Sequence, residues 1–128
     1  MREDEIQKNL VKWLKAKRVV FSVGLEGAKR HPAEQARLKA MGMQPGQPDI
    51  SLYLPGGRTV FIELKTEKGR VSDNQRERHE LLKNLGFDVH VLRARDGGAA
   101  IDLVEAIIQA AIHMGRRGNE SQGNHLGI

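Results

Sequence analysis

Residues 49–65 read DISLYLPGGRTVFIELK, and this stretch decides the fold. Two runs rich in apolar and β-branched residues, 49–54 and 59–65, flank the turn-forming sequence PGGR. Apolar side chains occupy alternate positions, which are Ile50, Leu52 and Leu54 in the first run and Val60, Ile62 and Leu64 in the second. Because successive side chains of a strand point to opposite faces, the pattern predicts a β-hairpin with one apolar face.

The opposite face of this hairpin carries three charged side chains. Asp49 begins the first strand, and Glu63 and Lys65 end the second. If the apolar faces coincide, Asp49 lies opposite Glu63 when the turn takes three residues, or opposite Lys65 when it takes five. In both cases two carboxylates and an amine converge. The carboxylates are suitable ligands for Mg²⁺, the main-chain carbonyl of Leu64 could supply a third oxygen, and Lys65 could orient an attacking water.

The same residues also fit an interpretation without chemistry. Glu63 and Lys65 would then form an ordinary exposed pair on a sheet, and Asp49 would merely follow a proline turn. Three-residue E-x-K matches are frequent, so the spacing needs support from the rest of the chain.

Hydrophobic spacing predicts further elements on both sides of the hairpin. The order of these elements predicts an α/β fold with a mixed four-stranded sheet flanked by helices. The strand–helix–strand unit that starts with 59–65 should cross over right-handed, which makes its two strands parallel. The predicted helices cover residues 3–17, 32–41, 72–85 and 101–112, and the other predicted strands cover 19–23 and 87–92.

Composition limits the classes of protein that the chain can belong to. Its 128 residues predict one domain, over 1–114, followed by a flexible polar tail over 115–128. Lys and Arg outnumber Asp and Glu by 21 to 16, and this basic balance favours polyanionic partners such as nucleic acid. The absence of cysteine excludes disulfides, thiolate catalysis and cysteine-bound zinc. The acidic N-terminus and the lack of a long apolar run predict a cytoplasmic protein without a membrane partner.

Five stretches of the chain together resemble the VRR-NUC nucleases of the PD-(D/E)xK superfamily, especially their short stand-alone phage and bacterial members. These stretches are EDEIQ (3–7), ARLKAMG (36–42), GQPDI (46–50), FIELKT (61–66) and GRVSDNQ (69–75). The resemblance implies a restriction-endonuclease-like PD-(D/E)xK core and a divalent-metal-dependent DNA nuclease, with Asp49, Glu63 and Lys65 as core residues. Many phage relatives carry an Asn-Gly-Gly-like stretch where this chain has residues 24–27, which leaves the substrate preference open.

The resemblance also implies an auxiliary glutamate in the first helix and a glutamine near the active site. Helical geometry favours Glu3 over Glu5, because Glu3 shares the side of the apolar stripe whereas Glu5 points roughly opposite. Glu3 could instead simply stabilise the helix N-terminus. Gln75 is explained without catalysis by a capping box with Ser72, but the resemblance places it near the site.

These observations predict an enzyme that hydrolyses phosphodiester bonds of DNA, with branched or four-way-junction DNA as the expected substrate and a homodimer as the expected assembly. Mg²⁺ is the expected cofactor, with Mn²⁺ as a substitute. The alternatives are a non-catalytic nucleic-acid-binding domain with the same fold and an interaction module whose charge is incidental. The predicted catalytic residues are Glu3, Asp49, Glu63, Lys65 and Gln75, and the predicted metal ligands are Asp49, Glu63 and the carbonyl of Leu64.

Two further groups of residues bear on this prediction. The five histidines show no metal-ligand spacing, and His79 is interpreted as a satisfied helix residue. Basic residues that could meet phosphates are Lys29, Arg30, Arg37, Lys39, Lys68 and Arg70, although solvated surface charge is their ordinary role.

Overall fold

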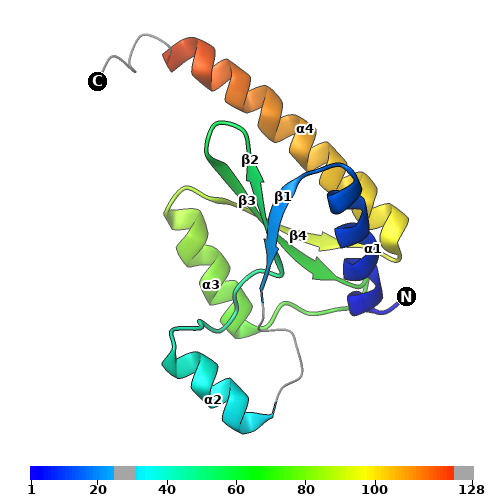
Figure 1. The fold of residues 1–128 in the computed structure, drawn as a ribbon, viewed down its shortest axis with the longest axis vertical. Helices are drawn as coiled ribbons and strands as arrows, with labels where there is room; N and C mark the ends of the chain where they lie inside the picture. Colours follow the sequence, from blue (N-terminus) through cyan, green and yellow to red (C-terminus); the bar gives the residue numbers. More distant parts are fainter. Residues whose placement is uncertain (25–30, 123–128) are drawn as a thin grey trace.

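The fold centres on a four-stranded mixed sheet with the strand order β1-β2-β3-β4 (Figure 1). The computed structural model describes residues 1–24 and 31–122. Strands β1 and β2 and strands β2 and β3 pair antiparallel, whereas β3 and β4 pair parallel. The mixed four-stranded sheet and the parallel pair are therefore as predicted. The strands are β1 (Val20–Val23), β2 (Ile50–Leu54), β3 (Arg58–Lys65) and β4 (Asp88–Arg93).

The turn between β2 and β3 sets the register of the hairpin. Leu54 pairs with Arg58, so the turn takes three residues, and Ile50 pairs with Ile62. Gly56 and Gly57 both have positive φ, of 82° and 71°, which only glycine adopts without strain. The three-residue alternative is therefore the one that the chain adopts, and the register places Asp49 beside Glu63.

Helices cover both faces of the sheet (Figure 1). Helices α1 (Glu3–Ala16) and α4 (Gly97–Gln122) lie on the apolar face, where Ile6, Leu10 and Leu14 of α1 join the core. Helix α3 (Asp73–Asn84) lies on the other face and connects β3 to β4, while α2 (Pro32–Ala40) stands apart and buries no residue. The even positions of β2 and β3 thus face the core, and the odd positions of β3 face α3.

Helix α4 differs most from the prediction. It begins at Gly97, where Asp96 Oδ1 accepts a hydrogen bond of 2.8 Å from the backbone N–H of Ala99. It continues to Gln122, so the boundary expected at Gly115 is not a helix end, and the expected tail is helical over its first residues. Alternating polar residues and glycines suggested a break there, but good helix formers between them allow propagation. Residues 123–128 of that tail lie outside the described residues.

The same helix bears on the expectation that no segment could cross a membrane. In the part of the chain that the structure describes, one window, Gly97–Met114, is long and apolar enough to do so by length and composition alone. Its buried residues Ala100, Val104, Ile108 and Ala111 pack into the core against the sheet and α1, as those of a core helix do.

Candidate active site

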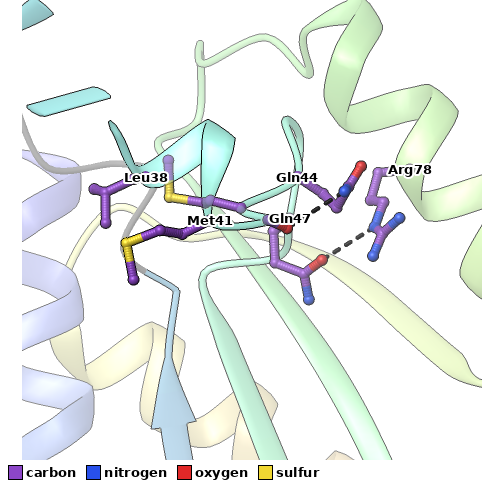
Figure 2. Close-up of a pocket in the computed structure, with 7 residues that line it drawn as sticks. Leu38, Met41, Gln44, Gln47 and Arg78 are labelled. Atoms are coloured by element: carbon purple, nitrogen blue, oxygen red, sulfur yellow. Dashed lines mark hydrogen bonds between the residues drawn. The ribbon is translucent and has the colours of Figure 1, made fainter. Parts of the chain in front are cut away.

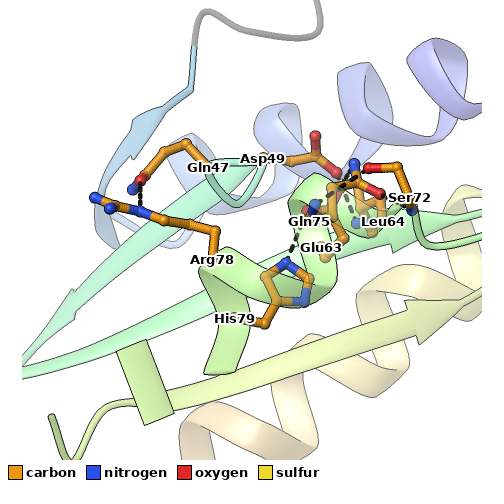
Figure 3. A network of polar contacts seen from close by, with 8 residues as sticks. All are labelled: Gln47, Asp49, Glu63, Leu64, Ser72, Gln75, Arg78 and His79. Carbon is orange, nitrogen blue, oxygen red and sulfur yellow. Dashed lines mark hydrogen bonds and ion pairs between the residues drawn. The ribbon is translucent and has the colours of Figure 1, made fainter. Parts of the chain in front are cut away.

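Asp49 and Glu63 meet where β2 begins and β3 ends (Figure 3), and the charge of Lys65 acts on Glu63 there. Asp49 directly precedes β2, and its Oδ2 accepts a hydrogen bond of 2.7 Å from the backbone N–H of Leu64. Glu63 is fully buried and Lys65 is 8% exposed. The structure thus brings Asp49, Glu63 and Lys65 together as the alternation and the register require.

The carbonyl of Leu64 points toward this group. In an extended strand, the N–H and C=O of one residue point to the same side, and the next residue points to the other. The N–H of Leu64 faces Asp49, whereas the carbonyl of Lys65 accepts from the N–H of Ala94 at 3.0 Å on the β4 side. The Leu64 carbonyl therefore points to the β2 side, where Asp49 lies, and it stays the predicted third oxygen ligand.

Helix α3 holds both carboxylate oxygens of Glu63. Gln75 Nε2 donates to Glu63 Oε2 at 3.2 Å, and His79 Nε2 lies 3.2 Å from Glu63 Oε1 (Figure 3). Gln75 and His79 are four residues apart, so they occupy one face of the helix on successive turns. The carboxyl group of Glu63 is therefore fixed in position and orientation from the α3 side.

Gln75 performs two structural tasks with the two ends of its amide. Its Oε1 accepts from the backbone N–H of Ser72 at 2.9 Å, and its own backbone N–H donates to Ser72 Oγ at 3.1 Å. These two bonds form the predicted capping box at the start of α3. Its Nε2 remains for Glu63, so the capping interpretation and the placement near the site hold together.

The carboxyl groups of half-buried Asp49 and fully buried Glu63 share a hydrogen bond. Burial, the hydrogen bond with Asp49 and the charge of Asp49 together raise the pKa of Glu63 from its usual value to about 9, although the charge of Lys65 lowers it. At neutral pH a proton therefore resides on this pair when no other cation is present. A divalent cation can replace that proton, which is the condition a carboxylate metal site must meet.

The donor set also suits a hard cation. Two carboxylates and one main-chain carbonyl are oxygen ligands of the kind that Mg²⁺ and Mn²⁺ prefer. Among the described residues, no group of three or more His, Asp or Glu side chains is arranged to hold a metal, so the Leu64 carbonyl is essential to the proposed set. The residues present fit the predicted ion on this basis.

Glu3 lies within electrostatic reach of the same group. Burial raises its pKa, the charge of Lys65 lowers it, and the charge of Asp49 raises it. Glu5 is exposed. The first turn of α1 thus directs Glu3 to the end of the sheet that carries the candidate site.

His79 is the residue of this group that the sequence interpretation missed. It is 4% exposed, and burial lowers its pKa, which keeps the imidazole neutral. A neutral imidazole with a proton on Nε2 can donate to an ionised Glu63. His79 lies four residues after Gln75, on the same helix face, and this spacing could have indicated its contact with Glu63. The spacing typical of metal-binding histidines does not indicate it, because His79 contacts a carboxylate.

The loop that leads into Asp49 rests directly on α3. A Cβ atom on Gly46 would lie 2.1 Å from the backbone oxygen of Asn74, and Gly46 has a φ of 77°. Arg78 Nε also donates to Gln47 Oε1 at 3.0 Å. One helix therefore positions both carboxylates, Glu63 by side-chain contacts and Asp49 through its loop.

The structure describes four of the six predicted phosphate-contacting residues. Arg37 and Lys39 are exposed on α2, and Lys68 and Arg70 are exposed between β3 and α3. Lys29 and Arg30 lie outside the described residues, as does most of the stretch 24–27 that departs from the phage relatives.

The fold and this carboxylate and lysine group define a nuclease-type α/β domain. The family model of the VRR-NUC domain matches residues 1–96, and the chain therefore belongs to the VRR-NUC family. One solved structure, described as a VRR-NUC domain protein, matches with a TM-score of 0.61 and 24% identity over 85% of this chain and 89% of the other. Another, described as a VRR-NUC domain, matches with a TM-score of 0.54 and 23% identity over 80% of this chain and 94% of the other. No curated protein matches significantly.

Proposed function

We propose that this chain is a divalent-metal-dependent deoxyribonuclease that cleaves DNA internally. The observation that carries the proposal is the pairing of half-buried Asp49 with fully buried Glu63, next to Lys65 and the backbone of Leu64 at one end of the sheet. Placing two carboxyl groups together away from water costs free energy, and a catalytic centre explains why the fold holds such a pair.

Each residue has a defined role in this proposal. Asp49, Glu63 and the Leu64 carbonyl hold Mg²⁺, which supplies charge stabilisation at the phosphate and lowers the pKa of water. Lys65 orients the attacking water and neutralises phosphate charge. Gln75 and His79 position Glu63 from α3, and Glu3 interacts with the same centre from α1.

The substrate is proposed to be branched DNA, and the acting species a homodimer. One copy offers a small basic surface around one site, and pairing two copies enlarges that surface and presents two symmetry-related sites. Paired cuts across a four-way junction suit such an arrangement. A cytoplasmic location agrees with the proposed substrate.

A panel of linear, flapped and four-way DNA tests the proposal. The substrates are incubated with Mg²⁺, Mn²⁺ or EDTA while light scattering measures the assembly at the same protein concentration. We expect a dimer that cleaves DNA only when the metal is present. It should cleave the four-way junction fastest. Tight DNA binding with no cleavage under any condition would favour the non-catalytic alternative, and a monomer that cuts linear duplex as fast would overturn the junction proposal.

Glu63→Gln should stabilise the metal-free protein at alkaline pH. The folded state binds an extra proton between the ordinary carboxyl pKa and the raised pKa of Glu63, so the wild type loses stability as pH rises through this range. Glutamine does not ionise, so the variant should not lose this stability. Its free energy of unfolding should exceed that of the wild type by about 1–3 kcal/mol near pH 8. Thermal melts in EDTA from about pH 5 to pH 9 measure it.

The same melts with added Mn²⁺ provide the control. The wild type should gain stability with the metal, because the ion binds only the folded state, whereas Glu63→Gln should gain little. Equal gains in both proteins would show that the ion binds elsewhere.

Glu3→Gln should slow cleavage about tenfold or more, because it removes a charge that acts on the reacting centre. Glu5→Gln is the matched control in the same helical turn, and it should cleave at the wild-type rate because Glu5 is exposed. Initial rates at saturating metal give the comparison. Slower cleavage by the Glu5 variant than by the Glu3 variant would reverse the assignment.

His79→Leu should weaken metal binding about 10- to 100-fold, because it removes the contact that orients a ligand carboxylate. His79→Gln keeps a nitrogen donor at a similar reach and should restore most of the affinity, which a purely structural role would not require. Calorimetric titration with Mn²⁺ measures both, and Glu80→Gln, at an exposed neighbour on α3, serves as control. Unchanged affinity in His79→Leu would exclude the positioning role.

A further inference from the structure

A pocket of about 420 Å³ lies between the turn after α2 and helix α3 (Figure 2). One wall comes from the end of α2 and the turn after it, and the other includes Arg78 of α3. Its lining is apolar on one side and able to form hydrogen bonds on the other. The lining residues are Leu38, Met41, Gly42, Met43, Gln44, Gln47 and Arg78.

The apolar wall has no evident role in stabilising the core. Helix α2 buries no residue, and Met41 is 71% exposed. Leu38 and Met43 are half-buried and line the pocket, but they are not part of the core cluster. Helix α2 and the turn after it thus add nothing to the core but form one wall of the pocket. A role in binding explains this segment better than a role in folding.

The pocket and the candidate active site share their supporting residues. Gln47 lines the pocket and stands two residues before Asp49, and Arg78 lines it and directly precedes His79. The bond of 3.0 Å between Arg78 and Gln47 joins the loop to the helix at this boundary (Figure 3). The loop before Asp49 and helix α3 therefore connect the pocket to the candidate active site.

We propose that this pocket binds one base of the DNA strand, next to the phosphate at the active site. The flat faces of the base would contact Leu38 and the methionine thioethers, which pack well against aromatic rings. Its polar edge would meet the side-chain amides of Gln44 and Gln47 and the guanidinium of Arg78. The proposal rests on the proposed function, since it names the part of the substrate that the pocket receives.

The charge around the pocket suits a nucleotide better than an uncharged ligand. Arg37, which also forms an ion pair of 3.2 Å with Glu34, and Lys39 are exposed on the helix that forms the apolar wall, where they can meet the phosphates on either side of the base. The chain is poor in aromatic residues, with only 4% Phe, Trp and Tyr, so an aliphatic and thioether pocket is the available way to hold a base.

Methionine methyl groups provide a direct test. The chain has four methionines, of which Met41 and Met43 line the pocket, while Met114 lies on α4 and serves as an internal control. The full chain, labelled with ¹³C at these methyl groups, is titrated to millimolar concentrations with deoxynucleoside 5′-monophosphates. A parallel titration uses deoxyribose 5-phosphate, which lacks the base.

The nucleotides should shift the resonances of Met41 and Met43, whereas deoxyribose 5-phosphate should not, and Met114 should stay unchanged. Shifts of equal size with the sugar phosphate, or no base-dependent shift at either methionine, would overturn the proposal. The measurement needs no cleavage. A base-binding chain that cuts no DNA would therefore contradict only the proposed nuclease function, and an active nuclease without these shifts would contradict only the base pocket.

A pocket-filling variant gives a second test. Leu38→Trp should abolish the base-dependent shifts and raise KM for DNA about tenfold, with kcat little changed. Ala36→Trp places the same side chain at an exposed position of α2 that does not line the pocket, and it should preserve both properties. Retention of the shifts in Leu38→Trp would place the bound base elsewhere.

Discussion

Lys65→Ala should reduce DNA cleavage by at least about a thousandfold while the protein remains folded. The ammonium group of Lys65 is almost fully buried beside Asp49 and Glu63, where no solvent ion can replace it at low cost. Its loss removes both the group that orients the water and a positive charge at the phosphate. Single-turnover cleavage at saturating metal, with circular dichroism on the same samples, is the measurement.

Asp49→Ala should have an effect of similar size for a different reason. It removes a proposed metal ligand and also leaves the backbone N–H of Leu64 without its 2.7 Å acceptor. Asp49→Asn keeps an oxygen for that N–H and should restore folding but not cleavage, which separates the two losses. Both variants should still bind DNA in EDTA. Wild-type turnover by Lys65→Ala or Asp49→Asn would disprove the assignment of the active site.

Gly46→Ala should displace the loop that carries Asp49, and it is the largest effect expected outside the catalytic group. The new Cβ would meet the backbone oxygen of Asn74 at 2.1 Å, and backbone cannot move aside as a flexible side chain can. The positive φ of 77° adds strain for any residue except glycine. We expect a loss of about 2–4 kcal/mol in the free energy of unfolding, or an equivalent loss of metal affinity if the loop shifts instead.

Gly56→Ala is the matched control for this prediction. Gly56 also has a positive φ, of 82°, but an added Cβ there meets nothing within 4 Å. This variant isolates the cost of the backbone conformation, about 1 kcal/mol, from the cost of the collision. Urea unfolding and Mn²⁺ titration of both variants give the comparison. Equal effects at the two glycines would show that the contact between the loop and α3 has no special importance.

The hairpin and its site were predictable because short-range patterns determine them. Alternating residues in β2 and β3 indicate both the core face and the face that carries Asp49, Glu63 and Lys65. The sequence left the turn length open, because PGGR contains residues suited to turns of either size. Only the pairing of Leu54 with Arg58 in the folded chain selects the three-residue turn and brings Asp49 beside Glu63.

Long-range contacts account for what the sequence did not reveal. The two bonds from α3 to Glu63 depend on how closely that helix approaches β3, which no local pattern encodes. The pocket likewise depends on how the segment before Asp49 folds back toward Arg78. The end of α4 was placed too early because glycines and polar residues weaken a helix signal without always ending a helix.

Alternate residues at the end of strand β3 belong to the core and to the candidate site. Val60, Ile62 and Leu64 are buried in the core with α1 and α4, whereas Glu63 and Lys65 lie in the candidate active site on the other face. Near the end of the strand, neighbouring positions therefore serve different purposes: Ile62 and Leu64 contribute to the core, and Glu63 and Lys65 to the candidate site. Apolar replacements of similar volume at Val60, Ile62 or Leu64 can therefore change the free energy of unfolding while Glu63 and Lys65 stay in place, although both sets lie within eight consecutive residues.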